Sequence, residues 1–252
     1  MKIAIVTGAS SGMGRETIIQ IADRFGGIDE IWAVARREER LRELRRRLPV
    51  PLRIFPLDIT EEESIEALRE ALAARRPDVK ILVNSAGYGK IGKVGDLGLA
   101  DETGMVRLNC ETLCAVTHLA LPYMSDHGRI IQFASSAGFL PQPKFAIYAA
   151  TKAFVLSYSR ALNVELKPRD ISVTAVCPGP VKTEFFDIAE TTGNVPLYKK
   201  LAMADPKKVV RLALRDSMMG KSVSVYGPLM KAFFLLCKIV PHEILLKIME
   251  RM

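Results

Sequence analysis

Short apolar runs alternate with longer amphipathic segments along most of this chain of 252 residues. The apolar runs have the composition of buried β-strands, and each ends at a polar, small or turn-forming residue. They cover residues 2–7, 30–35, 52–57, 79–87, 128–136 and 171–179. The segments between them repeat apolar residues at helical spacing. They predict helices over residues 12–25, 36–47, 60–73, 104–126 and 146–167.

Strands that are apolar throughout need cover on both faces, so this order predicts a doubly wound parallel sheet between two layers of helices. We therefore expect a single three-layer α/β/α domain of the Rossmann type over residues 1–252. The composition agrees, since 49% of the residues are hydrophobic and 25% are charged. Two local signals refine the helix ends: Gly26-Gly27 closes the first helix, and Thr60 with Glu63 forms a capping box for the third.

The charge narrows the possible partners. A net charge of +8 suits nucleic acid, an anionic membrane or a phosphorylated small molecule. Much of it lies in residues 36–47, where Glu38 and Glu43 precede Arg42 and Arg47 by four positions. An exposed helix with internal ion pairs explains this run better than a nucleic-acid surface does. We expect no nucleic-acid partner.

The cysteines and the first residues indicate the compartment. Four cysteines without a C-x-x-C pair predict reduced, buried thiols and no metal site. The chain opens directly into an apolar strand without a signal-peptide pattern, so we expect a cytoplasmic protein.

Two motifs carry candidate chemistry. The turn at residues 8–14 has the spacing G-x-x-x-G-x-G, which brings backbone close to a pyrophosphate at a helix N-terminus. It differs from the common G-x-G-x-x-G pattern, and an ordinary tight turn is the alternative. The second motif is Tyr148 with Lys152, four positions apart on one helix face. Its alternative is a surface lysine that lies along a packed tyrosine.

Taken together, these motifs resemble a known family. The T-G-x-x-x-G-x-G turn, N-S-A-G at residues 84–87, Ser135 thirteen residues before Y-x-x-x-K, and Pro178-Gly179 are similar to the pattern of the short-chain dehydrogenase/reductase family. The resemblance covers roughly residues 1–185 and weakens beyond them.

The resemblance implies four catalytic residues. Tyr148 would exchange a proton with the substrate oxygen while a nicotinamide exchanges a hydride with the substrate carbon. Lys152 would lower the pKa of that phenol, which is about 10 when free, and bind the nicotinamide ribose. Ser135, rather than Ser136, would orient the substrate carbonyl. Asn109 would hold a water for proton relay, with a structural amide as the alternative.

The resemblance also implies the cofactor contacts. Asp58 would contact the adenine and Thr183 the nicotinamide carboxamide. Asn84 either contributes to the site or braces the sheet, and Ser85 stands where the family has a second asparagine. The full set expected at the cofactor is Gly8, Ser10, Ser11, Gly12, Met13, Gly14, Arg36, Arg37, Asp58, Asn84, Ala86, Gly87, Tyr148, Lys152, Pro178, Gly179 and Thr183.

The end of the second strand indicates which cofactor is used. An acidic residue there would bind the ribose hydroxyl of NAD, whereas an arginine binds a phosphate with two parallel hydrogen bonds. Arg36 and Arg37, together with Ser10 and Ser11, favour NADP(H) over NAD(H). The alternative is that both arginines only begin the exposed basic helix.

The last part of the chain holds two further predicted segments. Residues 184–205 form a substrate lid, and residues 228–252 form an apolar helical tail interrupted by Lys231, Lys238 and Pro241. The tail is too interrupted to span a membrane. Lying on a membrane surface, packing on a partner subunit and closing the substrate pocket are the three alternatives. By resemblance we expect a homodimer or homotetramer.

The leading hypothesis is an NADP(H)-dependent oxidoreductase that interconverts a carbonyl and a secondary alcohol on an apolar small molecule. The alternative is a catalytically silent NADP-binding regulatory protein of the same fold.

Overall fold

A computed structural model describes residues 1–189 and 203–250 of the chain. Their strands form one parallel sheet in the order β3-β2-β1-β4-β5-β6-β7. The chain adds β2 and β3 on one side of β1 and then β4 to β7 on its other side, so the strand order reverses between β1 and β4. The strands are β1 (Lys2–Thr7), β2 (Glu30–Val34), β3 (Leu52–Phe55), β4 (Asp78–Asn84), β5 (Arg129–Phe133), β6 (Ser172–Val176) and β7 (Val223–Ser224). This sheet confirms the predicted doubly wound α/β fold.

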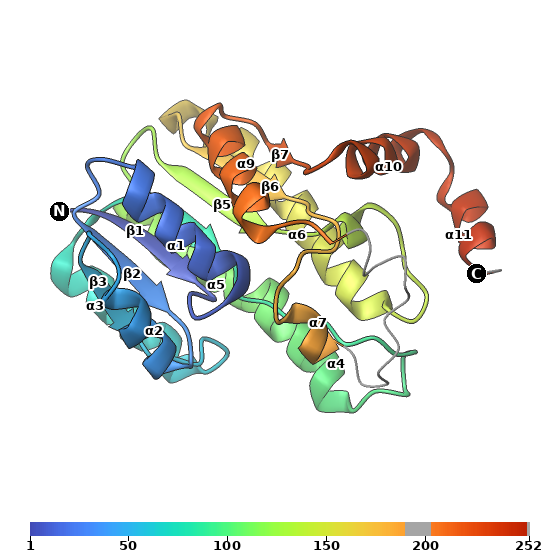
Figure 1. Cartoon of the computed structure of the whole chain (residues 1–252), viewed down its shortest axis with the longest axis horizontal. Coiled ribbons are helices and arrows are strands. Elements are labelled where there is room, and N and C mark those ends of the chain that lie inside the picture. The colour runs from blue at the N-terminus through green and yellow to red at the C-terminus, as the bar shows by residue number, and fades with distance from the viewer. Residues whose placement is uncertain (190–202, 251–252) are drawn as a thin grey trace.

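Helices cover both faces of the sheet (Figure 1). One layer consists of α1 (Gly12–Arg24), α2 (Glu38–Arg45) and α9 (Pro206–Met218); the other consists of α3 (Glu62–Arg75), α5 (Thr112–Ala120) and α6 (Ala146–Glu165). Strand β1 shows why both layers are needed. Ala4 and Val6 pack into the first layer, Ile3 and Ile5 pack into the second, and all four are fully buried.

Helix α2 has the predicted amphipathic character. Leu41 and Leu44 are buried, and the expected ion pair from Arg42 to Glu38 forms at 2.7 Å between Nη2 and Oε1. The arginine run is therefore mainly an exposed helix face, as predicted.

The capping-box prediction is wrong. The residue that caps α3 is Glu61, and its side chain makes no capping hydrogen bond. Instead, the backbone N–H and the hydroxyl of Thr60 donate to Oδ1 of Asp58, at 3.1 and 2.8 Å. In a capping box the Thr60 hydroxyl would accept a hydrogen bond from a backbone N–H at the start of the helix. Here it donates to the Asp58 carboxylate, a strong local acceptor, so a turn centred on Asp58 forms.

The predicted helix over residues 104–126 is interrupted. It begins earlier, as α4 (Leu99–Val106), passes through a π-helical turn (Arg107–Glu111), and continues as α5 before a short 3-10 turn (Leu121–Tyr123). The extra residue of a π-turn leaves the apolar periodicity almost unchanged, so the sequence does not reveal it. Strand β7 was not predicted either, because two residues are too short for a pattern.

Only the two ends of the predicted lid lie within the described residues. Helix α7 (Phe185–Ala189) forms its first part, while residues 190–202 lie outside the described residues. At the far end, Ala204 forms a parallel bridge with Val181, and Asp205 caps α9 through a hydrogen bond from Lys207.

The tail forms α10 (Pro228–Ile239) and α11 (His242–Glu250), which lie beyond α9 and β7 at one end of the molecule (Figure 1). The inner face of α10 packs on the sheet domain, where Phe234 lies 4.7 Å from Phe139 between ring centroids. Its outer face is apolar and exposed. The exposed residues of the two helices include Leu229, Leu235, Leu236, Ile239, Ile244 and Ile248. None of the described helices is long and apolar enough to pass through a membrane.

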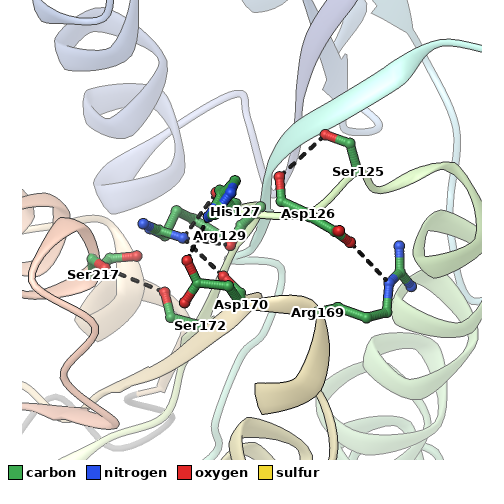
Figure 2. A network of polar contacts seen from close by, with 9 residues as sticks. Ser125, Asp126, His127, Arg129, Arg169, Asp170, Ser172 and Ser217 are labelled. Atoms are coloured by element: carbon green, nitrogen blue, oxygen red, sulfur yellow. Dashed lines mark hydrogen bonds and ion pairs between the residues drawn. The ribbon is translucent and has the colours of Figure 1, made fainter.

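A network of polar contacts joins the amino ends of β5 and β6 (Figure 2). His127 contacts Asp170 through Nδ1 and Oδ2, and Arg169 approaches Asp126 at 3.6 Å. Arg129 donates from Nη1 to the carbonyl oxygen of His127 at 2.8 Å. These contacts fix the loops at the amino edge of the sheet, opposite the strand ends at which a ligand site is predicted.

Candidate active site

Ser135 stands in the loop after β5, and three contacts fix its position. Its Oγ accepts a hydrogen bond from the Ala137 N–H at 3.1 Å, and the neighbouring Ser136 N–H donates to Pro178 O at 2.9 Å. The loop also lies directly on α6, because a Cβ atom at Gly138 would come within 2.6 Å of Lys152 O. Only glycine permits this approach, which brings the predicted serine to the helix that carries Tyr148 and Lys152.

Tyr148 is enclosed by aromatic rings and backbone. Its ring stacks on Phe145 with centroids 4.3 Å apart and lies 5.3 Å from Phe185. A Cβ atom at Gly89 would come within 2.6 Å of the same ring. Burial raises the pKa of Tyr148 to about 12, while an interaction with the Ser135 side chain acts in the opposite direction. The net direction is opposite to the lowering that the sequence predicts from a neighbouring cation, because removal from water dominates.

Lys152 lies beside this ring, as the spacing of four predicts. Its Nζ is 5.7 Å from the Tyr148 ring centroid and donates to Phe133 O at 2.8 Å. The side chain is buried, and burial lowers its pKa to about 8. The alternative of a surface lysine is therefore wrong. The ammonium group is anchored at the end of β5, within the same site as the phenol.

Asn109 sits in the π-helical turn and is almost fully buried. Its Oδ1 accepts from the Tyr88 N–H at 3.1 Å, and its Nδ2 donates to Tyr88 O at 2.9 Å and to Thr151 Oγ1 at 3.0 Å. A Cβ atom at Gly87 would come within 2.9 Å of Asn109 Oδ1 and 3.4 Å of Lys152 Nζ. The asparagine therefore borders the lysine, and it also fixes the backbone after β4.

The glycine-rich turn leaves a helix N-terminus open. Gly8 has φ +66°, and a Cβ atom there would come within 2.7 Å of Ala86 N. The Ser11 side chain does not cap α1, which has no acidic residue in its first turn. The first amides of α1 therefore keep their hydrogen-bonding capacity and their positive dipole end, which fits the pyrophosphate of a dinucleotide.

Arg37 connects the second strand to that turn. Its guanidinium donates from Nε to Ser10 Oγ at 3.1 Å and from Nη2 to Ser11 Oγ at 2.6 Å. The third nitrogen of the guanidinium, Nη1, donates to Glu184, whose carboxylate also accepts a hydrogen bond from Arg40. The sequence predicts Arg37 and both serines in one site, and the structure brings them together. The sequence pattern does not single out Glu184 or Arg40, although Arg40 lies one helical turn after Arg36 and Arg37.

Arg36 points to a different neighbour. Its Nη1 approaches Asp58 Oδ2 at 3.4 Å. Burial alone would raise the pKa of Asp58, but the hydrogen bonds from Thr60 and the charge of Arg36 outweigh it and hold that pKa below its usual value. Asp58 is thus an anionic, half-exposed acceptor at the end of β3, where an adenine contact is predicted.

Two predicted cofactor residues face the protein interior. Asn84 donates from Nδ2 to Thr117 Oγ1 and Gln132 Oε1, both at 3.0 Å, which supports the sheet-bracing alternative. Met13, the second residue of α1, is partly buried and packs against the core. Thr7 opens the T-G-x-x-x-G-x-G motif but was not among the predicted site residues. Its Oγ1 accepts from the amides of residues 85 and 86 and so holds the end of β4.

The remaining predicted residues lie in the loop after β6. Thr183 lies against Gly12, since a Cβ atom at Gly12 would come within 3.5 Å of it. Gly179 lies under Met230 of α10, whose Sδ would be 2.7 Å from a Cβ atom there. The tail thus covers this loop, which supports the pocket-closing alternative for its inner face.

The cysteines are free thiols. Burial raises the pKa of Cys110 to about 11 and that of Cys177 to about 12, so both stay protonated at neutral pH. Among the described residues, no group of three or more histidine, cysteine or acidic side chains is arranged to hold a metal ion.

The chain is similar to known proteins over most of its length. Residues 2–192 match the family described as short chain dehydrogenase. Over 236 residues the chain is 35% identical to sulfoacetaldehyde reductase 2 of Chromohalobacter salexigens, covering 88% of this chain and 91% of that one. It is 35% identical to the NADP-dependent 3-hydroxy acid dehydrogenase of Escherichia coli over 190 residues, covering 74% and 75%. A solved short-chain dehydrogenase from Sphingobium yanoikuyae in complex with NADPH superposes with a TM-score of 0.79 at 27% identity, covering 96% and 97%.

Proposed function

Because this chain belongs to the short-chain dehydrogenase/reductase family and is therefore an oxidoreductase with a nicotinamide cofactor, we propose that it uses NADP(H) to interconvert a carbonyl and a secondary alcohol on an apolar small molecule. One observation carries the proposal. Tyr148, Ser135 and Lys152 come together at the carboxyl edge of the sheet, and an arginine and two serines at the same edge would hold a phosphate.

The residues that would hold the cofactor follow the strand ends. The open N-terminus of α1 would bind the pyrophosphate, Asp58 the adenine, and Lys152 the nicotinamide ribose. Thr183 and the loop at Pro178-Gly179 would border the nicotinamide. When bound, the cofactor supplies or accepts the hydride at the substrate carbon.

The protein's own groups would handle the proton. Tyr148 is protonated at neutral pH, because burial raises its pKa to about 12. In that form it can donate its phenolic proton to a carbonyl oxygen as negative charge develops there. The Ser135 hydroxyl, beside Tyr148, would orient that oxygen. Lys152 would stabilise the phenolate left behind, and a lysine with a pKa of about 8 can also release a proton to refill it.

The preference for NADP(H) rests on Arg37. Its guanidinium makes hydrogen bonds to both Ser10 and Ser11, so three donor groups from the turn after β1 and the end of β2 lie together where a 2′-phosphate would arrive. The relative from Escherichia coli is named as NADP-dependent, and the Sphingobium structure contains NADPH.

The side of the site that faces the substrate is apolar. Met105 and Tyr148 form a small cluster with Tyr88, Phe145 and Phe185 around the phenol. Such a wall excludes water and binds hydrocarbon groups, so we infer a substrate with an apolar body on at least one side of its carbonyl.

The exposed faces of α10 and α11 are the surface we propose for contact with a second copy of the chain or with a membrane. Sedimentation of the full chain, together with flotation on anionic vesicles, separates the two. A monomer that floats with vesicles supports the membrane contact, and a dimer or tetramer that does not float supports the subunit contact.

A direct test of the proposed function measures turnover. The protein is incubated with a panel of ketones and aldehydes of increasing apolar size, with NADPH and NADH in parallel, and cofactor absorbance is followed. We expect consumption of NADPH that depends on Tyr148. Cofactor binding without any Tyr148-dependent turnover would contradict the enzyme proposal and favour the alternative of a silent regulatory protein.

A further inference from the structure

Three charged side chains meet above the serines of the glycine-rich turn, and one of them comes from a distant part of the chain. Glu184 follows the loop after β6, whereas Arg37 and Arg40 belong to the region of β2 and α2. Arg37 donates from Nη1 to Glu184 Oε2 at 2.8 Å, and Arg40 donates to the other carboxylate oxygen. The carboxylate is therefore held at both of its oxygens.

The arrangement is an anion site that already contains an anion. Guanidinium groups and hydroxyls are the donors that proteins use for phosphates. Here Glu184 accepts one hydrogen bond from each of the two guanidinium groups. The hydrogen bond from Arg37, with that from Arg40, lowers the pKa of Glu184, so this carboxylate is charged at neutral pH. The three side chains are 41–45% exposed, and a ligand from solution can reach them.

We propose, resting on the NADP(H) function above, that Glu184 competes with the 2′-phosphate of the cofactor for Arg37 and Arg40, and so sets how strongly the protein prefers NADP(H) over NAD(H). Two anions cannot use the same guanidinium donors, so an arriving 2′-phosphate displaces the carboxylate. NAD(H) carries a hydroxyl at that position and leaves the carboxylate in place.

The next residue connects this exchange to the catalytic site. Phe185 covers the Tyr148 ring at 5.3 Å, and its N–H donates to Thr183 Oγ1 at 3.4 Å. The carboxylate that binds the two arginines is therefore adjacent in the chain to the ring that covers Tyr148.

The test uses Glu184→Gln and two probes that carry no nicotinamide. Adenosine 2′,5′-bisphosphate and 5′-AMP share the adenosine and differ in the 2′-phosphate, and their dissociation constants are measured by titration calorimetry. We expect the variant to bind the bisphosphate about three- to tenfold more tightly than the wild type, the scale of one or two exposed ion pairs. Binding of 5′-AMP should change by less than about twofold.

Two controls isolate the local effect. Glu43→Gln removes the same charge from an exposed pair at the end of α2, the helix that carries Arg40. Glu43 contacts Arg47 there at 2.6 Å, so this variant reports any general electrostatic gain. In an Arg37→Gln background, the gain from Glu184→Gln should shrink, because the shared partner is gone.

Bisphosphate binding that is unchanged or weaker in Glu184→Gln, or an equal gain in Glu43→Gln, would overturn the inference. Failure of the proposed function has a different signature. If wild-type protein binds neither NADPH nor NADH, the cofactor proposal itself fails; if it binds NADPH and Glu184→Gln has no effect, only the competition is wrong.

Discussion

The two edges of the sheet use polar side chains in opposite ways. At the amino edge, His127 and Asp170 pair with each other while their side chains remain 76% and 73% exposed (Figure 2). At the carboxyl edge, Tyr148 and Lys152 are 7% and 5% exposed, and burial moves the pKa of each away from its ordinary value.

This difference separates structural from functional polar groups. Exposed partners that only fix a loop keep their solvation, so they cost little and contribute little. Burial of a phenol and an ammonium in one site is costly, and such groups are expected where chemistry requires them. Four predictions follow the comparison from its strongest consequence to its weakest.

Tyr148→Phe should reduce kcat/KM by about 10²- to 10⁴-fold, because it removes the group that gives its proton to the carbonyl oxygen while keeping the ring that packs on Phe145. Steady-state kinetics measure turnover, and cofactor titration measures the binding of NADPH. The dissociation constant for NADPH should stay close to that of the wild type. Tyr158→Phe on the same helix is the matched control, and a comparable loss there would show that the effect is not specific to the site.

Lys152 should give the protein an unusual dependence of stability on pH. Its folded pKa is about 8, below the ordinary 10.5, so between these values the unfolded state holds a proton that the folded state has released. The free energy of unfolding should therefore rise by about 3 kcal/mol as pH goes from 8 to 10.5, and the penalty of the buried charge is fully present below pH 8.

Denaturant unfolding of wild type and Lys152→Met at several pH values measures this contribution. Cys110 and Cys177 act in the opposite direction above pH 9, since burial raises their pKa values, so the difference between the two proteins is the quantity to follow. Parallel pH curves for both proteins would mean that Lys152 is not buried as a titrating group.

Gly14→Ala should damage the cofactor edge. A Cβ atom at this position would overlap the carbonyl oxygen of Gly8, and backbone on both sides would have to shift. We expect a loss of about 1–3 kcal/mol in the free energy of unfolding and weaker binding of NADPH. Gly26→Ala is the control, because a Cβ atom there meets nothing within 4 Å. Equal effects of the two substitutions would contradict the close approach.

His127→Asn should have the smallest effect. Asparagine tolerates the positive φ of 64° at this position, and the pair that it removes is exposed. The free energy of unfolding should change by less than about 1 kcal/mol, and turnover should not change. A large loss of activity would remove the distinction between the two edges.

The sequence predicted the elements whose physics is local. The apolar residues of strands such as β1 predict burial on both faces. The spacing from Ser135 to Tyr148 and Lys152 predicts their proximity, because one loop and one helix carry all three. Contacts made by tertiary packing were not visible. The ion pair from Glu184 to Arg37 joins residues 147 positions apart, and the cover of Tyr148 by Phe185 depends on the same return of the chain.

Local competition explains the other errors. The Thr60 hydroxyl donates to Asp58 and does not cap the start of α3. The π-turn around Asn109 shifts a side chain by one residue without changing the residue types around it.

The contact between Met230 and Gly179 has a consequence for biosynthesis. Because α10 follows all seven described strands in the chain, the ribosome delivers the cover of the loop after β6 only after these strands have been made. A nascent chain that has reached only Gly227 already contains every predicted cofactor contact, yet its loop after β6 lacks the cover of Met230 until α10 emerges.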